Sequence, residues 1–322
     1  MKAFNLFTTL LTALVIPNTV FAQPALKPCG TITRSTTLKS DCAAPLIVGA
    51  DNIKINLNGF AVVSKLDYFP EGGIGDIHIE NRHGVTVTNG KVGKFCLLCA
   101  SIRGGHSNRV TNMSLLAGDE GVGLLVDRSR GNLIKNVKVS STGARVGVHI
   151  LDSDKNIIDH LTNDGSLDSG AYISGNRNRL RRSVIQSQQN IEQPVGVWIR
   201  QGRRNVIERN DIRCEFSRSI PGILLFPRSS DTTIKSNSIN GCQNGIETEA
   251  ARTVIKGNRV VNSIQAGIQV TSLENTIYSN TVENSGTLDM TDSNLNCGTN
   301  DWKNNSFSTD SEGDGPSAGC IR

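Results

Sequence analysis

The stretch Asn132-Leu-Ile-Lys-Asn136-Val-Lys-Val139 decides the fold, because variants of it recur along the chain. Each copy combines a polar residue, an aliphatic residue, often an Asn, and a second aliphatic residue. Clear copies begin at Asn205, Thr232, Thr253 and Asn275, and weaker copies begin at Asn108, Asn156 and Asn178. The first aliphatic residues of the copies lie 21 to 27 positions apart: Val110, Ile134, Ile158, Leu180, Ile207, Ile234, Ile255 and Ile277. A repeat of this length indicates a solenoid.

A second short segment precedes most copies and begins at a glycine: Gly123, Gly147, Gly170, Gly196, Gly222, Gly245 and Gly267. In both segments, apolar residues alternate with period two and are mostly Val and Ile, which is typical of strands. Gly and Asn recur between them and would break a helix in every turn. A leucine-rich repeat needs a denser Leu framework, and a propeller blade needs a longer period. The sequence therefore predicts an all-β, right-handed parallel β-helix of about 9–10 rungs.

The recurring asparagines have a structural interpretation. They stand at positions 112, 136, 210, 237, 258 and 280. Asn tolerates the left-handed conformation of a tight turn, and asparagines stacked on successive rungs can form a hydrogen-bonded ladder. We expect these residues to serve the coil rather than a ligand.

The ends of the chain differ from the repeat. Residues 1–22 have the pattern of a signal peptide: Lys2, an apolar run over residues 10–16, and Phe21 and Ala22 before the expected cleavage site. An uncleaved anchor is the alternative, and no other apolar run is long enough to span a bilayer. We predict an N-terminal cap over 23–50, the β-helix over 51–293, and a disulfide-closed C-terminal cap over 294–322.

All eight cysteines follow the expected cleavage site, and an even number in an exported chain predicts disulfides. The sequence does not fix which cysteines pair; the economical arrangement joins neighbours along the chain, which gives Cys29–Cys42, Cys96–Cys99, Cys214–Cys242 and Cys297–Cys320. Cys96 and Cys99 have redox-motif spacing but lack the βαβ context, and no second Cys/His pair completes a metal site.

The start of the coil carries a resemblance to a known family. Cys29-Gly-Thr-Ile-Thr-Arg-Ser-Thr-Thr-Leu38, followed by Val48-Gly-Ala-Asp-Asn-Ile-Lys-Ile-Asn-Leu-Asn-Gly59, resembles the entry into the helix of the bacterial β-helix proteins of the pectin-lyase-like superfamily. These include polysaccharide lyases, glycoside hydrolases, alginate epimerases and periplasmic NosD-type proteins. The polygalacturonase signatures and the Asp-Pro-His-Asp run of the epimerases are absent. The resemblance therefore implies the fold and leaves the activity open.

One outward row of the coil is the main functional signal. In each Gly-initiated strand, the residue between two inward positions should face solvent, which gives Leu125, His149, Tyr172, Trp198, Leu224, Glu247 and Gln269. Rungs lie about 4.8 Å apart, so His149, Tyr172 and Trp198 would form a stripe about 10 Å long. Tyr172 falls in line only if one turn is a residue shorter than its neighbour. Aromatic rings in a row suit the apolar faces of sugars.

Basic residues crowd the same part of a chain whose net charge is +5. Arg200 and Glu249 occupy the next outward position, and further arginines follow at positions 177, 179, 181, 182, 203, 204 and 209. Arg pairs with carboxylates and sulfates in a bidentate manner, which favours an acidic polysaccharide; export argues against nucleic acid. The alternative is that these arginines are ordinary solvated surface and that the aromatics pack under the turn at 186–194.

Lyases and epimerases of uronates need a cation, a base and an acid. Arg200, His149 and Tyr172 could fill these roles, with Glu247 as an alternative base. Trp198, Arg179, Arg181, Arg203 and Glu249 are the candidate substrate-binding residues. We expect no cofactor and no metal, although Asp127, Asp152, Asp154, Asp164 and Asp168 could be read as calcium ligands rather than structural turn residues.

These features favour a secreted or periplasmic monomer that binds an acidic polysaccharide. They leave open whether it is an enzyme; if it is, a polysaccharide lyase or a uronate epimerase is expected. The alternative is a non-catalytic β-helix, either a glycan-binding or surface-interaction module or a NosD-like accessory protein. No insertion into a membrane is expected.

Overall fold

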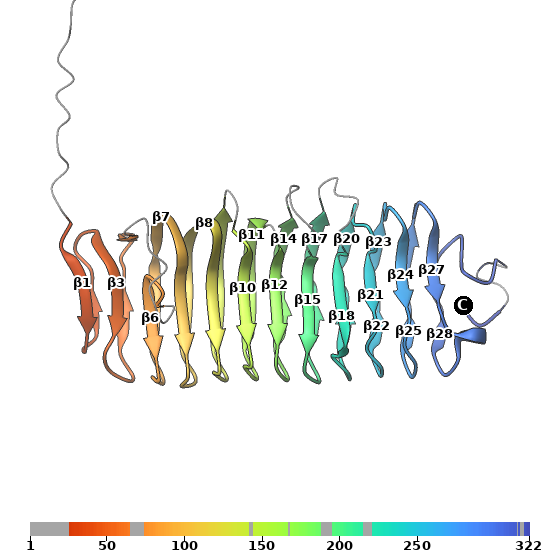
Figure 1. The fold of residues 1–322 in the computed structure, drawn as a ribbon, viewed down its shortest axis with the longest axis horizontal. Coiled ribbons are helices and arrows are strands. Elements are labelled where there is room, and N and C mark those ends of the chain that lie inside the picture. The colour runs from red at the N-terminus through yellow and green to blue at the C-terminus, as the bar shows by residue number, and fades with distance from the viewer. Residues whose placement is uncertain are drawn as a thin grey trace, which may run out of the picture.

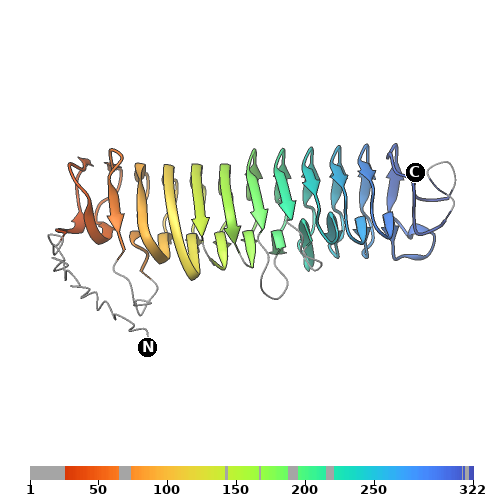
Figure 2. The same cartoon turned by 90° about the horizontal axis from the view of Figure 1, so that it is seen from above.

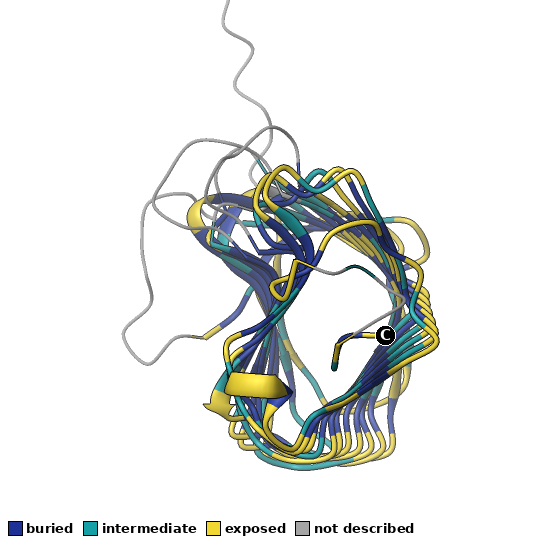
Figure 3. Cartoon of the chain, turned by 90° about the vertical axis from the view of Figure 1, so that its right-hand side faces the viewer, coloured by how far each residue is buried: buried dark blue, intermediate teal, exposed yellow. Residues whose placement is uncertain are grey.

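The computed structural model describes residues 26–64, 74–141, 144–166, 168–187, 195–214, 221–313, 315 and 319–322. The expected signal peptide lies outside these residues. The described chain is a coil of short parallel strands that stack side by side along one axis (Figure 1). Viewed along this axis, successive turns superimpose (Figure 3). The predicted parallel β-helix is confirmed.

Each turn contributes strands to three parallel sheets, which we name A, B and C. Sheet A contains β1 (Pro28–Ile32), β3 (Cys42–Val48), β6 (Ile77–Glu80), β10 (Val146–Leu151), β12 (Ser169–Ser174), β15 (Val195–Gln201), β18 (Ile223–Arg228), β21 (Ile246–Thr248), β24 (Ala266–Val270) and β27 (Leu288–Asp292).

Sheet B contains β2 (Thr36–Thr37), β4 (Lys54–Asn56), β13 (Arg179–Arg181), β16 (Val206–Glu208), β19 (Thr233–Lys235), β22 (Val254–Lys256), β25 (Thr276–Tyr278) and β28 (Asp301–Lys303). Sheet C contains β5 (Ala61–Val63), β14 (Val184–Ser187), β17 (Asp211–Cys214), β20 (Ser238–Asn240), β23 (Arg259–Val261) and β26 (Thr281–Glu283). Four long strands bend from one sheet into the next: β7 (Thr86–Arg103), β8 (Arg109–Asp127), β9 (Leu133–Ser141) and β11 (Ile157–Ser166).

Stacked aliphatic residues fill the coil. The predicted markers lie in register on neighbouring rungs, as in the pairs Val110 with Ile134 and Ile234 with Ile255, and they are almost fully buried. The inward residues of sheet A are buried as predicted, for example Val148 and Ile150. Period-two alternation in every strand therefore separates the core from the outer surface.

The recurring asparagines divide into two groups. Asn112 and Asn136 take positive φ angles of 53° and 52°, as expected for tight turns. Asn210, Asn237, Asn258 and Asn280 are buried, and the side-chain oxygen of each accepts the backbone N–H of the Asn or Ser one rung earlier at 2.9–3.0 Å. For these four, the positive φ belongs to the preceding residue.

The glycines that open the sheet A strands stand where the chain bends tightly. A Cβ at Gly196 would lie 2.5 Å from the carbonyl oxygen of Gly222 and 2.8 Å from Ile212 Cγ2. Contacts this short do not occur between ordinary side chains, so only glycine fits without displacing the neighbouring rung.

Parallel pairing extends over both segments that the sequence predicts as caps. Strand β1 pairs with β3, and β28 pairs with β25. The four predicted disulfides are present: Cys29–Cys42, Cys96–Cys99, Cys214–Cys242 and Cys297–Cys320.

A short 3₁₀ helix, η1 (Leu295–Cys297), opens the last segment, which lies at the C-terminal end of the coil (Figure 2). Phe307 and Ile321 in this segment are buried. No helix in the described ranges combines the length and the apolar character that a membrane span requires.

Candidate functional site

The outward row of sheet A has the predicted register. His149 lies opposite Tyr172, Tyr172 opposite Trp198, and Trp198 opposite Leu224. The row continues through Glu247 and Gln269 toward the C-terminus. Strands β10, β12, β15 and β18, which carry its central part, lie side by side in Figure 1. The turns between these strands differ in length, yet His149, Tyr172 and Trp198 still align on neighbouring strands. The aromatic stripe is therefore continuous.

The rings of the row pack against one another edge to face. Ring centroids are 4.5 Å apart between His149 and Tyr172, and 5.1 Å apart between Tyr172 and Trp198, with interplanar angles of 71° and 74°. Phe226 extends the row, because its ring lies 5.2 Å from that of Trp198 at 71°. Such pairs are a favoured aromatic geometry. Hereafter His149, Tyr172, Trp198 and Phe226 are the aromatic row.

Arg200 lies beside the aromatic row because of an irregularity in strand pairing. Ile199 pairs with Ile173, but the next pair is Gln201 with Ser174, so Arg200 is an extra residue in β15. An extra residue of this kind redirects a side chain. Arg200 is exposed, and its Nη1 donates to the hydroxyl of Tyr172 at 3.4 Å. The guanidinium therefore stands over the tyrosine hydroxyl.

Two nitrogens of the aromatic row are buried without a hydrogen-bond partner among the described residues: His149 Nε2 and Trp198 Nε1. Burial lowers the pKa of His149, and nearby Asp127 only partly offsets this effect. The imidazole is therefore neutral near pH 7 and can accept a proton or a hydrogen bond. Unsatisfied polar atoms beneath a surface are uncommon in folded proteins and are often found at functional sites.

Glu247 does not join His149, Tyr172 and Arg200. It lies four rungs from His149 along the row, which corresponds to about 19 Å at the usual rung spacing. One of its carboxylate oxygens accepts a hydrogen bond from Asn244 Nδ2 at 2.8 Å. The structure thus brings together three of the four predicted catalytic residues and separates the alternative base.

Two of the predicted substrate-binding arginines lie on sheet B, away from the aromatic row. Arg179 and Lys235 both pair with Glu208, which is buried. Burial alone would raise the pKa of Glu208, but the two cations outweigh it and lower the pKa to about 2. Arg181 and Arg182 likewise pair with Asp159, whose pKa is lowered because these cations outweigh its burial. The charges of these arginines are therefore already compensated.

Other arginines next to the aromatic row have no ion pair, and among them Arg203 lies close enough to Asp231 to help lower the pKa of that carboxyl. They lie at the ends of sheet A strands or on the turns that lead from there to sheet B; we name this region the A–B edge. Arg177, Arg200, Arg203, Arg204 and Arg228 are all exposed, and none has an ion pair within the described part of the chain. Neighbouring rungs hold them together, since Arg177 N–H donates to the carbonyl of Arg203 at 2.9 Å. We name these five residues the arginine cluster.

The remaining predicted binding residues flank this region. Trp198 belongs to the aromatic row, Arg203 to the arginine cluster, and Glu249 follows β21 on a later rung. Phe226 and Arg228 were not among the predicted site residues. The sequence carried a signal for both residues. Phe226 stands two positions after Leu224 of the outward row, as Arg200 stands two positions after Trp198, and Arg228 follows two positions later.

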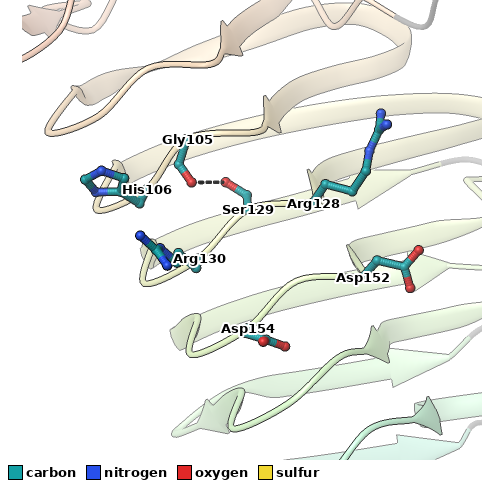
Figure 4. A pocket seen from close by; sticks show the side chains of 7 residues that line it. All are labelled: Gly105, His106, Arg128, Ser129, Arg130, Asp152 and Asp154. Atoms are coloured by element: carbon teal, nitrogen blue, oxygen red, sulfur yellow. Dashed lines mark hydrogen bonds between the residues drawn. The ribbon is translucent and has the colours of Figure 1, made fainter.

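A shallow depression of about 420 Å³ lies on the A–B edge, toward the N-terminus from the arginine cluster. Figure 4 shows its lining: Gly105, His106, Arg128, Ser129, Arg130, Asp152 and Asp154. Asp152 Oδ1 accepts hydrogen bonds from Ser174 Oγ and Gln201 Nε2, both at 3.1 Å. The depression was not predicted, since its residues are brought together only by the stacking of three turns.

The five aspartates considered as calcium ligands do not converge. In the ranges that the structure describes, one group brings three potential ligand atoms close together: Cys297, Glu312 and Cys320. Its two cysteines form a disulfide with each other, so they are not free to bind a metal.

Comparisons with known proteins identify the fold. The family model described as "Right handed beta helix region" matches residues 121–285, just over half of the chain. A structure of a mutant of the periplasmic alginate epimerase AlgG has a TM-score of 0.60 at 11% identity, covering 83% of this chain and 78% of that chain. A second AlgG structure has a TM-score of 0.58 at 13% identity, covering 78% and 65%.

An endo-xylogalacturonan hydrolase from Aspergillus tubingensis has a TM-score of 0.45 at 11% identity, covering 89% of this chain and 87% of that chain. No curated protein matches the sequence. At identities this low, the likeness to the two AlgG structures shows a shared fold.

Proposed function

This chain belongs to the right-handed β-helix family, and we propose that it binds an acidic polysaccharide along the outer face of sheet A. The observation that carries the proposal is the combination of the aromatic row with the arginine cluster at its edge. Aromatic rings supply apolar contact for sugar rings, while guanidinium groups bind carboxylates or sulfates. The arginine cluster lies on three of the four rungs that carry the aromatic row.

The local geometry supports this ligand over a neutral one. The arginines Arg179 and Arg181 on sheet B are held in ion pairs, whereas those of the arginine cluster are not. A cation without an internal partner retains its full charge for a ligand, and a row of such cations attracts a polyanion. His149 Nε2 and Trp198 Nε1 lie buried beneath the same surface without a hydrogen-bond partner among the described residues.

A periplasmic or extracellular location fits the four disulfides, which form and persist in oxidising compartments. The AlgG structures are described as a periplasmic alginate epimerase, and alginate is an acidic polysaccharide. Their similarity in fold is consistent with the proposal.

Binding should be measured directly with pectate, alginate, hyaluronan and chondroitin by titration calorimetry. We expect at least one of these polymers to bind, and Trp198→Ala and Arg203→Ala each to weaken that binding by about tenfold or more. Tyr278→Ala is the matched control, because Tyr278 lies on sheet B between Lys256 and Lys303. The proposal is wrong if no acidic polymer binds, or if the control weakens binding as much as Trp198→Ala.

A catalytic role is the more specific form of the proposal. Neutral His149 could remove a proton next to a uronate carboxylate, Arg200 could neutralise that carboxylate, and Tyr172 could protonate the leaving oxygen. If Tyr172 protonates the leaving oxygen, the bond to that oxygen breaks and an unsaturated product forms. If Tyr172 instead returns a proton to the opposite face of the carbon that His149 deprotonated, the glycosidic bond stays intact and the sugar is inverted. Absorbance of unsaturated ends and NMR of the polymer would detect the two products. Retained binding without either product would identify a non-catalytic binding module, which is the alternative function.

A further inference from the structure

A column of stacked turn residues runs along the A–B edge. On successive rungs, one residue of the turn takes the left-handed conformation, with φ between 56° and 62°. These residues are stacked, because the backbone N–H of one bonds to the carbonyl just before its equivalent on the next rung, as Lys155 does with Asn176 and Arg177 with Arg203, both at 2.9 Å. We name this set the turn column, and its members in chain order are Gly131, Lys155, Arg177, Arg204, Asp231, Arg252 and Glu274.

The signs of the charges differ between the two halves of the turn column. Toward the C-terminus they alternate, since Arg252 pairs with Asp231 at 2.8 Å and with Glu274 at 3.5 Å. The three residues before Asp231 instead carry the same charge on successive rungs. All three are exposed, and none has an ion pair in the part of the chain that the structure describes. Like charges on neighbouring strands repel one another, so this half of the column does not serve the stability of the coil.

The three cations stand on rungs that also carry the aromatic row. Lys155 follows β10, Arg177 follows β12 and Arg204 follows β15. These strands are neighbours in sheet A (Figure 1), and their outward rings are those of His149, Tyr172 and Trp198. Rings contact the apolar faces of sugars, and cations bind acidic groups. Each of the three rungs therefore has the two kinds of contact that one acidic sugar unit needs.

The rung spacing determines which pattern of negative groups the three cations can meet. Neighbouring rungs lie about 4.8 Å apart, close to the length of one sugar unit in an extended chain. A polymer with a negative group on every unit can meet all three cations. A polymer with one on every second unit can meet Lys155 and Arg204, which are about 10 Å apart, but leaves Arg177 beside an uncharged unit. Its other register would place one charge at Arg177 and the flanking charges beside Gly131 and Asp231, which are not cations.

We infer that Arg177 is the residue that distinguishes these two classes of acidic polysaccharide, and that the protein prefers a polymer with a negative charge on every unit. Arg177 gains a partner from such a polymer alone, whereas Lys155 and Arg204 gain partners from both classes. Arg200 adds to the preference, because its guanidinium reaches the hydroxyl of Tyr172 on the middle rung of the three. This inference rests on the proposed function and specifies how the same face reads the charge of its ligand.

The test measures affinities for pectate, a homopolymer of uronates, and for hyaluronan, in which uronate and N-acetylhexosamine alternate. We expect the wild type to bind pectate more tightly. Arg177→Gln should weaken pectate binding about three- to fivefold, the effect of one exposed ion pair, and should change hyaluronan binding by less than about twofold. Lys155→Gln, in contrast, should weaken the binding of both polymers.

Arg209→Gln is the matched control. Arg209 is exposed on the turn between β16 and β17, and it has no ion pair among the described residues. Its φ of 54° is close to the 57° of Arg177. The control therefore removes the same charge from the same backbone conformation, and it should leave both affinities unchanged.

Equal losses of pectate and hyaluronan binding in Arg177→Gln would overturn the inference. So would an equal loss of pectate binding in Arg209→Gln, or a preference of the wild type for hyaluronan. Should the wild type bind pectate alone, a loss in Arg177→Gln that exceeds the loss in Arg209→Gln supports the inference. If the wild type binds none of pectate, alginate, hyaluronan and chondroitin, the proposed function itself fails.

Discussion

Glu208→Gln tests whether the arginines of sheet B are structural rather than ligand-binding. The variant keeps the size of the buried Glu208 side chain but removes the negative charge with which both Arg179 and Lys235 pair. The pKa of Glu208 is lowered from 4.5 to about 2. At about 1.4 kcal/mol per pKa unit, this corresponds to roughly 3 kcal/mol of folding free energy at neutral pH.

Solvent reduces this value, because the side chains of Arg179 and Lys235 are 40% and 33% exposed. We therefore expect Glu208→Gln to lower the free energy of unfolding by about 1–2 kcal/mol at pH 7. The sign of the pH dependence follows from the lowered pKa: the ion pairs stabilise the folded state above pH 4.5, and the contribution is lost as the pH falls toward 2.

The assay is urea denaturation of the wild type and the variant at pH 7, 4 and 3. The difference in unfolding free energy should shrink to less than half between pH 7 and pH 3. A difference that is the same at all three pH values would show that the variant disturbs packing and not an ion pair. Polysaccharide binding at pH 7 should be unchanged; a loss of binding would contradict the assignment of Arg179 to a structural role.

Three further predictions concern the coil. Burial raises the pKa of Asp76 to about 6, and its Oδ2 has no hydrogen-bond partner among the described residues. Ionisation of Asp76 therefore destabilises the fold as the pH rises from about 4 to 6. In thermal denaturation, Asp76→Asn should be about 1–2 kcal/mol more stable than the wild type at pH 7.5 and equally stable below pH 4. Gly196→Ala should destabilise the coil by about 2 kcal/mol through contact with the next rung, whereas Gly93→Ala, whose Cβ would have no neighbour within 4 Å, should be neutral in the same assay. Asn237→Ala removes the side-chain hydrogen bonds to the backbones of Asn210 and Ile207. It should lower the midpoint of urea unfolding and reduce the free energy of unfolding by about 2 kcal/mol. An unchanged midpoint would show that the buried asparagine ladder contributes little to stability.

Several features of this protein were predictable because they follow from local patterns. Alternation with period two assigns each strand residue to the core or to the surface, as with Val148, His149 and Ile150. The repeat then stacks equivalent positions, which is why His149, Tyr172 and Trp198 align. Pairing of neighbouring cysteines succeeded because a coil keeps residues about one turn apart close together in space.

The role of each charged side chain was not predictable in the same way. Arg177 and Arg179 stand two positions apart in the sequence, yet Arg177 remains uncompensated at the A–B edge while Arg179 pairs with Glu208 on sheet B. The partner lies 29 positions away, and the turns between rungs vary in length. A sequence pattern therefore cannot state which carboxylate an arginine reaches.

The amino-acid sequence by itself determined the coil, its core and its aromatic row, because these depend on strand alternation and on the repeat. Only the tertiary structure decided which arginines are free to meet a ligand, where Arg200 points, and that Asp152 and Asp154 share a depression with Arg130. Those properties depend on contacts between side chains of different rungs, and the distances that control electrostatic interactions exist only after the rungs have stacked.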